Sequence, residues 1–352
     1  MTTRYAATRT QLDQALNEMG EPAYRARQLY EGLYTQRRPL EQLTNIPQSL
    51  RTRLANDLPL AFDVETLQHS DRGTTTKWLW RGAGGSQIET VLMRYPDRST
   101  VCVSSQAGCA MGCTFCATGQ AGFERHLDTG EILEQVLRAQ HASPQRVSNV
   151  VFMGMGEPLA NVDAVLDACT RLHEDVGLSA RHLTVSTVGV VPGMERLAAF
   201  DLPVTLAVSL HAPDDALREQ LVPLNRRYPI ADVLDAARAY ADRKGRRVSF
   251  EYACIEQVND LPEQADVLAA RLTGFRGGAH VNLIPLNATA GYAGRATSRD
   301  RIEAFARRLR DRGIEASVRR NRGVSIDAAC GQLRARAGAR PSAVRRSARM
   351  TP

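Results

Sequence analysis

The chain of 352 residues is 43% hydrophobic, 24% charged and 5% aromatic, a composition typical of a globular protein. Its length allows one large domain, or a large domain with a smaller unit attached. No run approaches the roughly 18 consecutive apolar residues of a membrane helix, and the N-terminal residues lack the apolar core of a secretion signal. We therefore expect a cytoplasmic protein without a membrane partner.

The net charge of +7 is unevenly distributed along the chain. Residues 301–352 contain 14 arginines and four acidic residues, a local charge of +10, so the rest of the chain sums to −3. A basic segment suits a polyanion such as RNA or DNA, although a solvated tail that only aids solubility gives the same pattern. Residues 334–352 lack apolar periodicity and are expected to be a disordered basic tail.

Residues 1–62 are expected to form a small helical domain. Leucines recur there at helical spacing between Leu29 and Leu54, interrupted by prolines. Residues 63–98 are β-rich, because "TKWLWRG" and "QIETVLMRY" flank a turn signal at Gly82–Gly85. This second stretch predicts a β-hairpin linker between the helical domain and the rest of the chain.

From residue 99 the pattern changes to short apolar runs that alternate with helical segments. The six β-type runs read, in order, "STVCVS", "NVVFMG", "HLTVST", "VTLAVS", "VSFEYA" and "AHVNLI". Helical patterns cover residues 130–141, 163–174, 230–243, 262–272 and 298–312. Six strand–helix units in series predict an α/β fold with a parallel sheet, either an open doubly wound sheet or a partial barrel. Such barrels gather their active-site residues at the carboxyl ends of the strands, where polar and glycine residues close nearly every strand here.

Three of the seven cysteines, Cys109, Cys113 and Cys116, lie in one short loop that reads "CAMGCTFC". In a reducing compartment, clustered cysteines indicate metal binding or redox catalysis rather than structural disulfides. A zinc site with a distant ligand and a chance cluster of buried thiols both remain open, although zinc sites usually supply a second pair of ligands. Three thiolates on a [4Fe–4S] cube would leave one iron open to another ligand.

The spacing CxxxCxxC directly after a first strand resembles the signature of radical S-adenosylmethionine (SAM) enzymes. Six ordered blocks between about residues 24 and 333 further resemble the RlmN/Cfr family of RNA adenine methyltransferases: "CVSSQAGCAMGCTFCATGQAGFERHL", "VFMGMGEPLANVDAV", "HLTVSTVGVVPG", "AVSLHAPDD", "NLIPLN" and "IDAACGQL". The resemblance implies a partial (β/α)6 radical SAM barrel over residues 99–333. It also implies a [4Fe–4S] cluster on the three loop cysteines, two SAM molecules per turnover, and an electron donor such as flavodoxin or ferredoxin. We expect a monomer.

The resemblance also implies roles for three further residues. Taken alone, Cys102 and Cys330 read as core thiols, and Glu89 reads as a solvated strand carboxylate. In the family, the position matching Cys330 is methylated by one SAM, and a 5′-deoxyadenosyl radical from a second SAM removes a hydrogen atom from that methyl group. The position matching Cys102 then releases the methylated base by thiolate attack, leaving a disulfide. Glu89 matches the general base.

The SAM pocket is implied in the same way. Gly156 and Glu157 follow the run "NVVFM" and match the residues that hold the amino group of SAM. The remaining matches are Ser186, Ser209, Leu210, His211 and Asn287. A glycine-rich turn alone is a weak signal, but all seven residues lie at or after the ends of predicted strands, as a site at the carboxyl ends requires.

The resemblance implies an enzyme that forms 2-methyladenosine in 23S ribosomal RNA and in tRNAs. "VFMGMGEPLAN" and "CVSSQAGC" favour this RlmN branch, while a Cfr-like enzyme acting on carbon 8 of the same ribosomal adenosine stays an alternative. A non-catalytic, metal-containing RNA-binding module is another. The helical domain would bind RNA, and four arginines are candidate phosphate contacts: Arg25, Arg27, Arg37 and Arg38.

Overall fold

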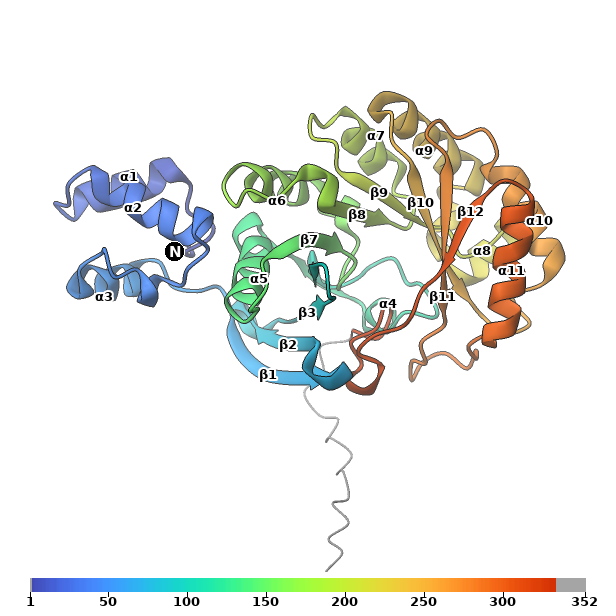
Figure 1. Cartoon of the computed structure of the whole chain (residues 1–352), viewed down its shortest axis with the longest axis horizontal. Coiled ribbons are helices and arrows are strands. Elements are labelled where there is room, and N and C mark those ends of the chain that lie inside the picture. The colour runs from blue at the N-terminus through green and yellow to red at the C-terminus, as the bar shows by residue number, and fades with distance from the viewer. Residues whose placement is uncertain (1, 334–352) are drawn as a thin grey trace, which may run out of the picture.

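The computed structural model describes residues 2–333, which form a small N-terminal helical unit beside a curved sheet wrapped in helices (Figure 1). The sheet has ten strands in the order β1-β2-β3-β4-β7-β8-β9-β10-β11-β12. The basic tail expected at 334–352 lies outside the described residues. Among the residues described, no helix is long and apolar enough to cross a membrane.

The N-terminal unit contains three α-helices joined by tight turns. They are α1 (Arg9–Glu18), α2 (Tyr24–Tyr30), which continues into a π-helical turn at Glu31–Thr35, and α3 (Gln48–Asp57). Thr8 caps α1 by accepting a hydrogen bond from the Gln11 amide at 3.3 Å. The leucines that predicted the helices are buried in the core of the unit, together with Leu12 and Leu16 of α1: Leu29, Leu33, Leu40, Leu43, Leu50 and Leu54.

This unit is fastened to the outside of the barrel by two buried arginines. Arg171 on α6 (Val162–Glu174) donates to the carbonyl of Tyr5 at 2.9 Å and to the hydroxyl of Tyr34 at 2.7 Å. Arg37 donates to the carbonyl of Val176 at 3.1 Å and is only 8% exposed. Arg37 is therefore a poor candidate for a phosphate contact, because carbonyl groups of the barrel occupy its guanidinium.

The β-rich stretch before residue 99 has three strands and is part of the main sheet. β1 (Asp63–Ser70), β2 (Thr75–Arg81) and β3 (Gln87–Arg94) form an antiparallel meander. β3 then pairs antiparallel with β4 (Ser99–Cys102). The hairpin that we expected at the glycine turn is the β2–β3 pair, and β1 adds a further strand to it.

Seven parallel strands form the barrel. After β4 come β7 (Val147–Phe152), β8 (Leu183–Thr187), β9 (Thr205–Ser209), β10 (Val248–Cys254), β11 (Ala279–Pro285) and β12 (Glu315–Val318). The first six correspond to the six predicted runs, and the predicted partial barrel is confirmed. β12 was not predicted, because it is a four-residue edge strand without a buried side chain. β1 and β12 are the two unpaired edges, so the barrel is open between them.

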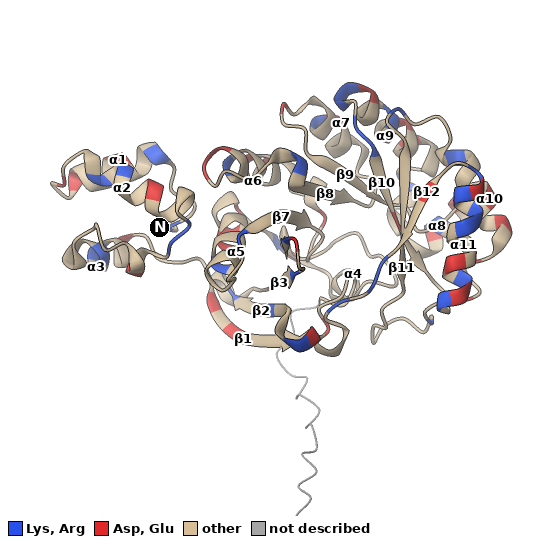
Figure 2. Ribbon diagram, viewed as in Figure 1, with Lys and Arg blue, Asp and Glu red and all other residues tan. Residues whose placement is uncertain are grey.

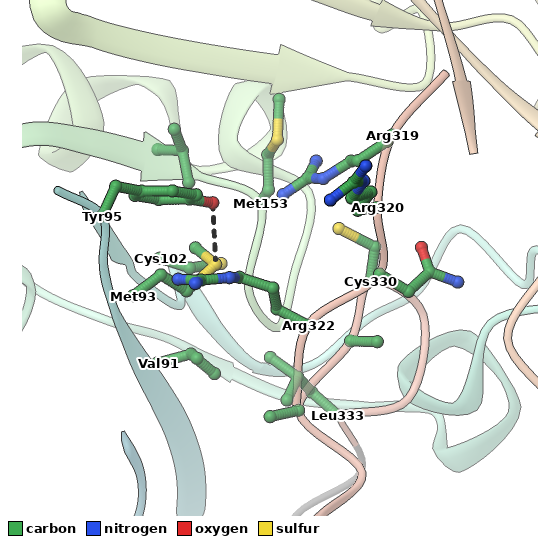
Figure 3. Close-up of a pocket in the computed structure, with 14 residues that line it drawn as sticks. Val91, Met93, Tyr95, Cys102, Met153, Arg319, Arg320, Arg322, Cys330 and Leu333 are labelled. Carbon is green, nitrogen blue, oxygen red and sulfur yellow. Dashed lines mark hydrogen bonds between the residues drawn. The ribbon is translucent and has the colours of Figure 1, made fainter. Parts of the chain in front are cut away.

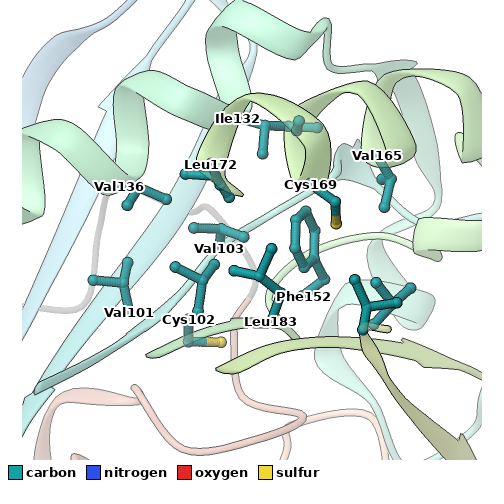
Figure 4. Close-up of a cluster of buried hydrophobic side chains, with 14 of the residues drawn as sticks. Val101, Cys102, Val103, Ile132, Val136, Phe152, Val165, Cys169, Leu172 and Leu183 are labelled. Atoms are coloured by element: carbon teal, nitrogen blue, oxygen red, sulfur yellow. The ribbon is translucent and has the colours of Figure 1, made fainter. Parts of the chain in front are cut away.

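Helices cover the outer face of the parallel strands. They are α5 (Thr129–His141), α6, α7 (Val191–Ala199), α8 (Asp215–Leu221), α9 (Ile230–Lys244), α10 (Pro262–Leu272) and α11 (Arg299–Asp311). Two short strands, β5 (Gln106–Gly108) and β6 (Phe123–His126), and the short helix α4 (Ala117–Ala121) surround the cysteine loop. Side chains alternate along β4: Val101 and Val103 point toward the helices, whereas Cys102 points to the inner side (Figure 4).

Candidate active site

The three-cysteine loop connects β5 to α4 in a tight turn. Gly108 adopts a φ of 72°, and a Cβ atom there would lie 2.0 Å from the carbonyl oxygen of Gly122. Only glycine therefore lets the loop close, with the Cys109 amide donating to that same carbonyl at 2.7 Å. The Cys116 amide donates to the carbonyl of Cys113 at 3.1 Å. These bonds fix the spacing of the three thiols.

The chemistry of the three thiols fits an iron–sulfur cluster. Burial raises the pKa of Cys109 to about 12, and burial raises the pKa of Cys113 well above its ordinary value. The neighbouring thiols and Glu157 also raise the pKa of Cys113, because several negative charges would share one apolar space. A cationic metal group is what would keep such thiols ionised. Within residues 2–333, no three acidic, histidine or cysteine side chains converge as ligands of one ion, but a cluster offers each thiolate a separate iron.

Glu157 is the best-defined member of the expected SAM pocket. Its carboxylate accepts hydrogen bonds from the amides of Leu159 at 3.0 Å and Val188 at 2.9 Å, so it links the ends of β7 and β8. Burial raises the pKa of Glu157 to about 7. Gly156 has a φ of 102° and packs against Gln106, where a Cβ would lie 2.6 Å away. A carboxylate held this way is suited to an ammonium group.

The end of β9 is held by an arginine that sequence reasoning missed. Arg218, fully buried on α8, donates to the carbonyls of Leu210 at 3.1 Å and Val188 at 2.6 Å. His211 accepts a hydrogen bond from the Ala253 amide at its Nδ1 atom, 3.0 Å away. Burial, with a contribution from Arg218, lowers the pKa of His211 to about 3, so its ring is neutral. Ser209 lies in the same stretch, at the end of β9.

Two more expected SAM residues have defined partners. The hydroxyl of Ser186 donates to the carbonyl of Phe152 at 2.6 Å. The side-chain amide of Asn287 donates to the backbone carbonyl of Cys330 at 2.9 Å, and its oxygen accepts from Asn321 at 2.6 Å. Asn287 therefore links the end of β11 to the segment that carries Cys330.

Cys102 and Cys330 line one pocket, together with residues of β3, β7 and the segment after β12 (Figure 3). Both thiols are free. Burial raises the pKa of Cys102 to about 12, and the nearby Cys330 adds to that rise. The volume open to a water-sized sphere between the lining residues is about 20 Å³, enough for one water molecule but too small for an adenine ring. Binding of a nucleobase here therefore needs a shift of the lining segments.

Arg319 is a second basic residue that sequence reasoning missed. It follows β12, in a run of basic residues that includes Arg320 and Arg322 (Figure 2), and it lines the pocket with both thiols. Its positive charge lowers the pKa of Cys102, opposing the effect of burial. The only available signal was the local arginine density, which did not reveal the orientation of any side chain.

Glu89 lies on β3 and forms a buried ion pair with Lys77 of β2 at 3.1 Å. The reading of Glu89 as a solvated carboxylate is therefore wrong. Val91 and Met93 on the same strand line the thiol pocket, whereas Glu89 is not among the lining residues. Lys77 was also missed, although a lysine within the apolar run "TKWLW" is itself a sign of a paired buried charge.

The remaining cysteines take no part in these groups. Cys169 on α6 is fully buried among apolar side chains (Figure 4), and Cys254 on β10 is 2% exposed. Their burial makes both of them core residues. The structure thus gathers Glu157, Ser186, His211 and Asn287 at the strand ends, and Cys102 with Cys330 in an adjoining pocket.

Two family models match the chain: the radical SAM superfamily over residues 103–266 and the ribosomal RNA large subunit methyltransferase N-terminal domain over residues 5–59. The chain is 53% identical over 338 residues to a probable dual-specificity RNA methyltransferase RlmN of Parafrankia sp., covering 90% of this chain and 87% of that protein. It is 52% identical over 343 residues to the corresponding protein of Chloroflexus aurantiacus, covering 93% and 91%. A crystal structure of a radical SAM methyltransferase from Sphaerobacter thermophilus is 47% identical, with a TM-score of 0.90 over 96% of this chain and 100% of that chain.

Proposed function

The chain belongs to the RlmN family of SAM-dependent radical RNA methyltransferases, and we propose that it methylates carbon 2 of adenosine 2503 in 23S ribosomal RNA and of adenosine 37 in tRNAs. The observation that carries this proposal is the pocket in which Cys102 and Cys330, both free, face the inner side of the barrel. Such a pair suits a transient disulfide. Cys109, Cys113 and Cys116 would hold a [4Fe–4S] cluster.

SAM would bind along the strand ends. Glu157, supported by Gly156, would hold its ammonium group, and the rest of the pocket would come from Ser186, Ser209, Leu210, His211 and Asn287. The neutral ring of His211 and the hydrogen-bonded amide of Asn287 support polar contacts without added charge. The link from Asn287 to Cys330 supports transfer of a methyl group from this site to the Cys330 sulfur.

When bound, the cluster and SAM would supply the methyl group and the radical that removes one hydrogen atom from it. They would also accept the one electron that the protein–RNA adduct loses after it has formed. The methyl carbon on the Cys330 sulfur then forms a bond to carbon 2 of adenine. Glu89 accepts the hydrogen of carbon 2 as a proton. Direct transfer is disfavoured because this ring carbon has no lone pair to attack a methyl group.

Release of the product needs the second thiol. The thiolate of Cys102 attacks the sulfur of Cys330, and the bond between that sulfur and the transferred carbon breaks. The electron pair of this bond goes to the carbon, which takes up a proton and becomes the methyl group. The products are 2-methyladenosine and a Cys102–Cys330 disulfide, which a two-electron thiol reductant must reduce. Arg319 beside both sulfurs supports the thiolate form of Cys102.

Residues 1–62, the proposed RNA-binding domain, would contribute to RNA binding. Arg27 has a side chain that is 66% exposed and pairs only loosely with Glu31, at 3.9 Å. Arg38 is also exposed, whereas the Arg25 side chain is 18% exposed and donates to the carbonyl of Asn45. Arg27 and Arg38 are therefore the better candidates for phosphate contacts. A monomer served by flavodoxin or ferredoxin completes the proposal.

The test is nucleoside mass spectrometry. The protein, with its cluster reconstituted anaerobically, is incubated with SAM, a reductant and protein-free ribosomal RNA or tRNA. Formation of 2-methyladenosine is the expected result. Formation of 8-methyladenosine would instead assign the Cfr-like reaction, and binding of RNA without iron, sulfide or SAM cleavage would identify a non-catalytic module.

A further inference from the structure

We propose that Lys77 is a positioning residue for RNA methylation, which holds the Glu89 carboxylate in its proton-accepting form and ties it to the segment that carries Cys330. The inference rests on the function proposed above, because it concerns how the general base Glu89 is kept ionised.

The first support is the geometry of the ion pair. In the β2–β3 pairing, Lys77 lies opposite Val91, and Glu89 lies opposite Leu79, so the two charged residues are diagonal neighbours on one face. Their nearest atoms, Nζ and Oε1, are 3.1 Å apart, and the side chains are 7% and 6% exposed. Val91 and Met93 lie two and four positions after Glu89 on β3, so they share its face, and they line the thiol pocket. The pair therefore borders the pocket from the sheet side.

The second support is a contact with the C-terminal segment. The Nζ atom of Lys77 also donates to the carbonyl of Asp327 at 3.3 Å, three residues before Cys330. A second tie lies nearby, where the Gly323 amide donates to the carboxylate of Asp71 at 3.0 Å. One ammonium thus contacts both the base and the segment that delivers the reacting carbon. Removal of this ammonium would therefore affect both at once.

The third support is the electrostatic requirement of a base. A buried carboxylate favours its neutral, protonated form unless a cation is close, and a protonated carboxyl cannot accept the adenine proton. The thiol pocket that borders the pair contributes the thiols of Cys102 and Cys330, the phenol of Tyr95 and the guanidinium groups of Arg319, Arg320 and Arg322, and Asp327 accepts from Lys77 through its backbone carbonyl. On the opposite face of β3, α5 contributes the neutral Gln135, which accepts from Thr90 at 2.8 Å. Lys77 places such a cation in direct contact with Glu89.

The experiment compares Lys77→Met, Lys77→Arg and the control Arg81→Met. Arg81 lies on the same strand, and its partner Glu65 on β1 is 3.2 Å away, so the control removes a cation from the hairpin without touching Glu89. Thermal unfolding identifies any variant that fails to fold. If Lys77→Met does not fold, Lys77→Arg takes its place in the comparison. Single-turnover reactions from pH 6 to pH 9 follow methylation of Cys330, the covalent protein–RNA adduct and 2-methyladenosine separately.

For Lys77→Met we expect normal methylation of Cys330, because that step needs no base. Resolution of the adduct should slow by roughly 10- to 100-fold at pH 7, and the acidic limb of its pH profile should move up by about one to two pH units. RNA deuterated at carbon 2 of the target adenine should then show a primary isotope effect that the control lacks. Lys77→Arg should restore most of the rate, because the cation is kept.

An unchanged pH profile and isotope effect in a folded Lys77→Met protein would overturn the inference, as would equal slowing of Cys330 methylation and adduct resolution. Failure of the underlying function has a different signature. If Glu89→Gln forms 2-methyladenosine at the normal rate, Glu89 is not the base, whatever Lys77 does.

Discussion

Two parts of the site are fixed by different kinds of contact. One is the rim, formed by the carboxyl ends of the strands with Glu157 and His211, and the other is the segment that carries Cys330. On the rim, Glu157 and His211 bond to backbone groups of neighbouring strands or their extensions, so the sheet itself sets their positions. The segment after β12 has no long helix or strand, and distant elements hold it: the amide of Ala117 bonds to Gly331, Thr118 to Leu333, and Asn287 to Cys330. A preformed rim therefore faces a segment that can shift when individual bonds are lost.

The largest effect should come from the two thiols, because they form and break covalent bonds. Cys330→Ala should abolish product, by on the order of 10³-fold or more, without forming an adduct. Cys102→Ala should also abolish release but accumulate the covalent protein–RNA adduct, visible on a denaturing gel. Cys254→Ala removes a buried thiol of the barrel wall and serves as the control. Release from Cys102→Ala at the control rate would rule out the disulfide step.

On the rim, the next effect concerns Glu157 and pH. With a pKa raised to about 7 by burial, the carboxyl becomes increasingly protonated as pH falls below 7 and loses its charge for the SAM ammonium. The affinity for SAM should therefore fall by about tenfold per pH unit below pH 7 and level off above it. Glu157→Gln should bind SAM weakly with a flat pH profile, measured by equilibrium dialysis of the reconstituted protein. A steep profile in this variant would assign the titration to another group.

A smaller effect should come from Asn321, which acts through Asn287. Its amide fixes the side chain of Asn287 through the 2.6 Å bond to the Asn287 oxygen. Asn321→Ala should slow methylation of Cys330 by roughly fivefold, corresponding to one lost hydrogen bond, in a single-turnover assay. Ser325→Ala, in the same segment but bonded to Ser70 at the surface, is the control. Equal rates in both variants would show that Asn287 keeps its orientation without the hydrogen bond from Asn321.

The smallest effect should come from Thr118, whose hydroxyl donates to the carbonyl of Leu333 at 2.5 Å. Thr118→Val keeps the shape but removes this bond, which contributes about 1 kcal/mol. Amide exchange at Gln332 should quicken by roughly fivefold in hydrogen–deuterium exchange. Thr129→Val, which removes a hydroxyl bonded to Ala164 at 3.5 Å, should leave that amide unchanged. Unaltered exchange in Thr118→Val would mean that other bonds suffice to hold the segment.

The same contrast explains what the sequence could predict. Six of the seven parallel strands of the barrel and the bounds of α10 could be predicted because apolar periodicity is a local property. α7 was missed because Pro192 and Gly193 obscure its pattern, and β12 because its side chains are not buried. The roles of Lys77, Arg218 and Arg319 could not be predicted, since each depends on partners that only the folded chain brings near. The family resemblance identified Cys330, but the neighbouring sequence did not indicate which distant residues hold that segment in place.

The C-terminal segment crosses the gap between the two unpaired edges, where Lys77 of β2 binds Asp327 and Arg322 donates to the carbonyl of Arg94 at 2.6 Å. Formation of the proposed Cys102–Cys330 disulfide would therefore turn an open barrel into a covalently closed ring of well over 200 residues. Closing so long a loop restricts the unfolded chain by about 5 kcal/mol in the chain-entropy model. The enzyme would then be at its most stable between turnovers, and each reduction would return it to a looser form that can admit the next RNA.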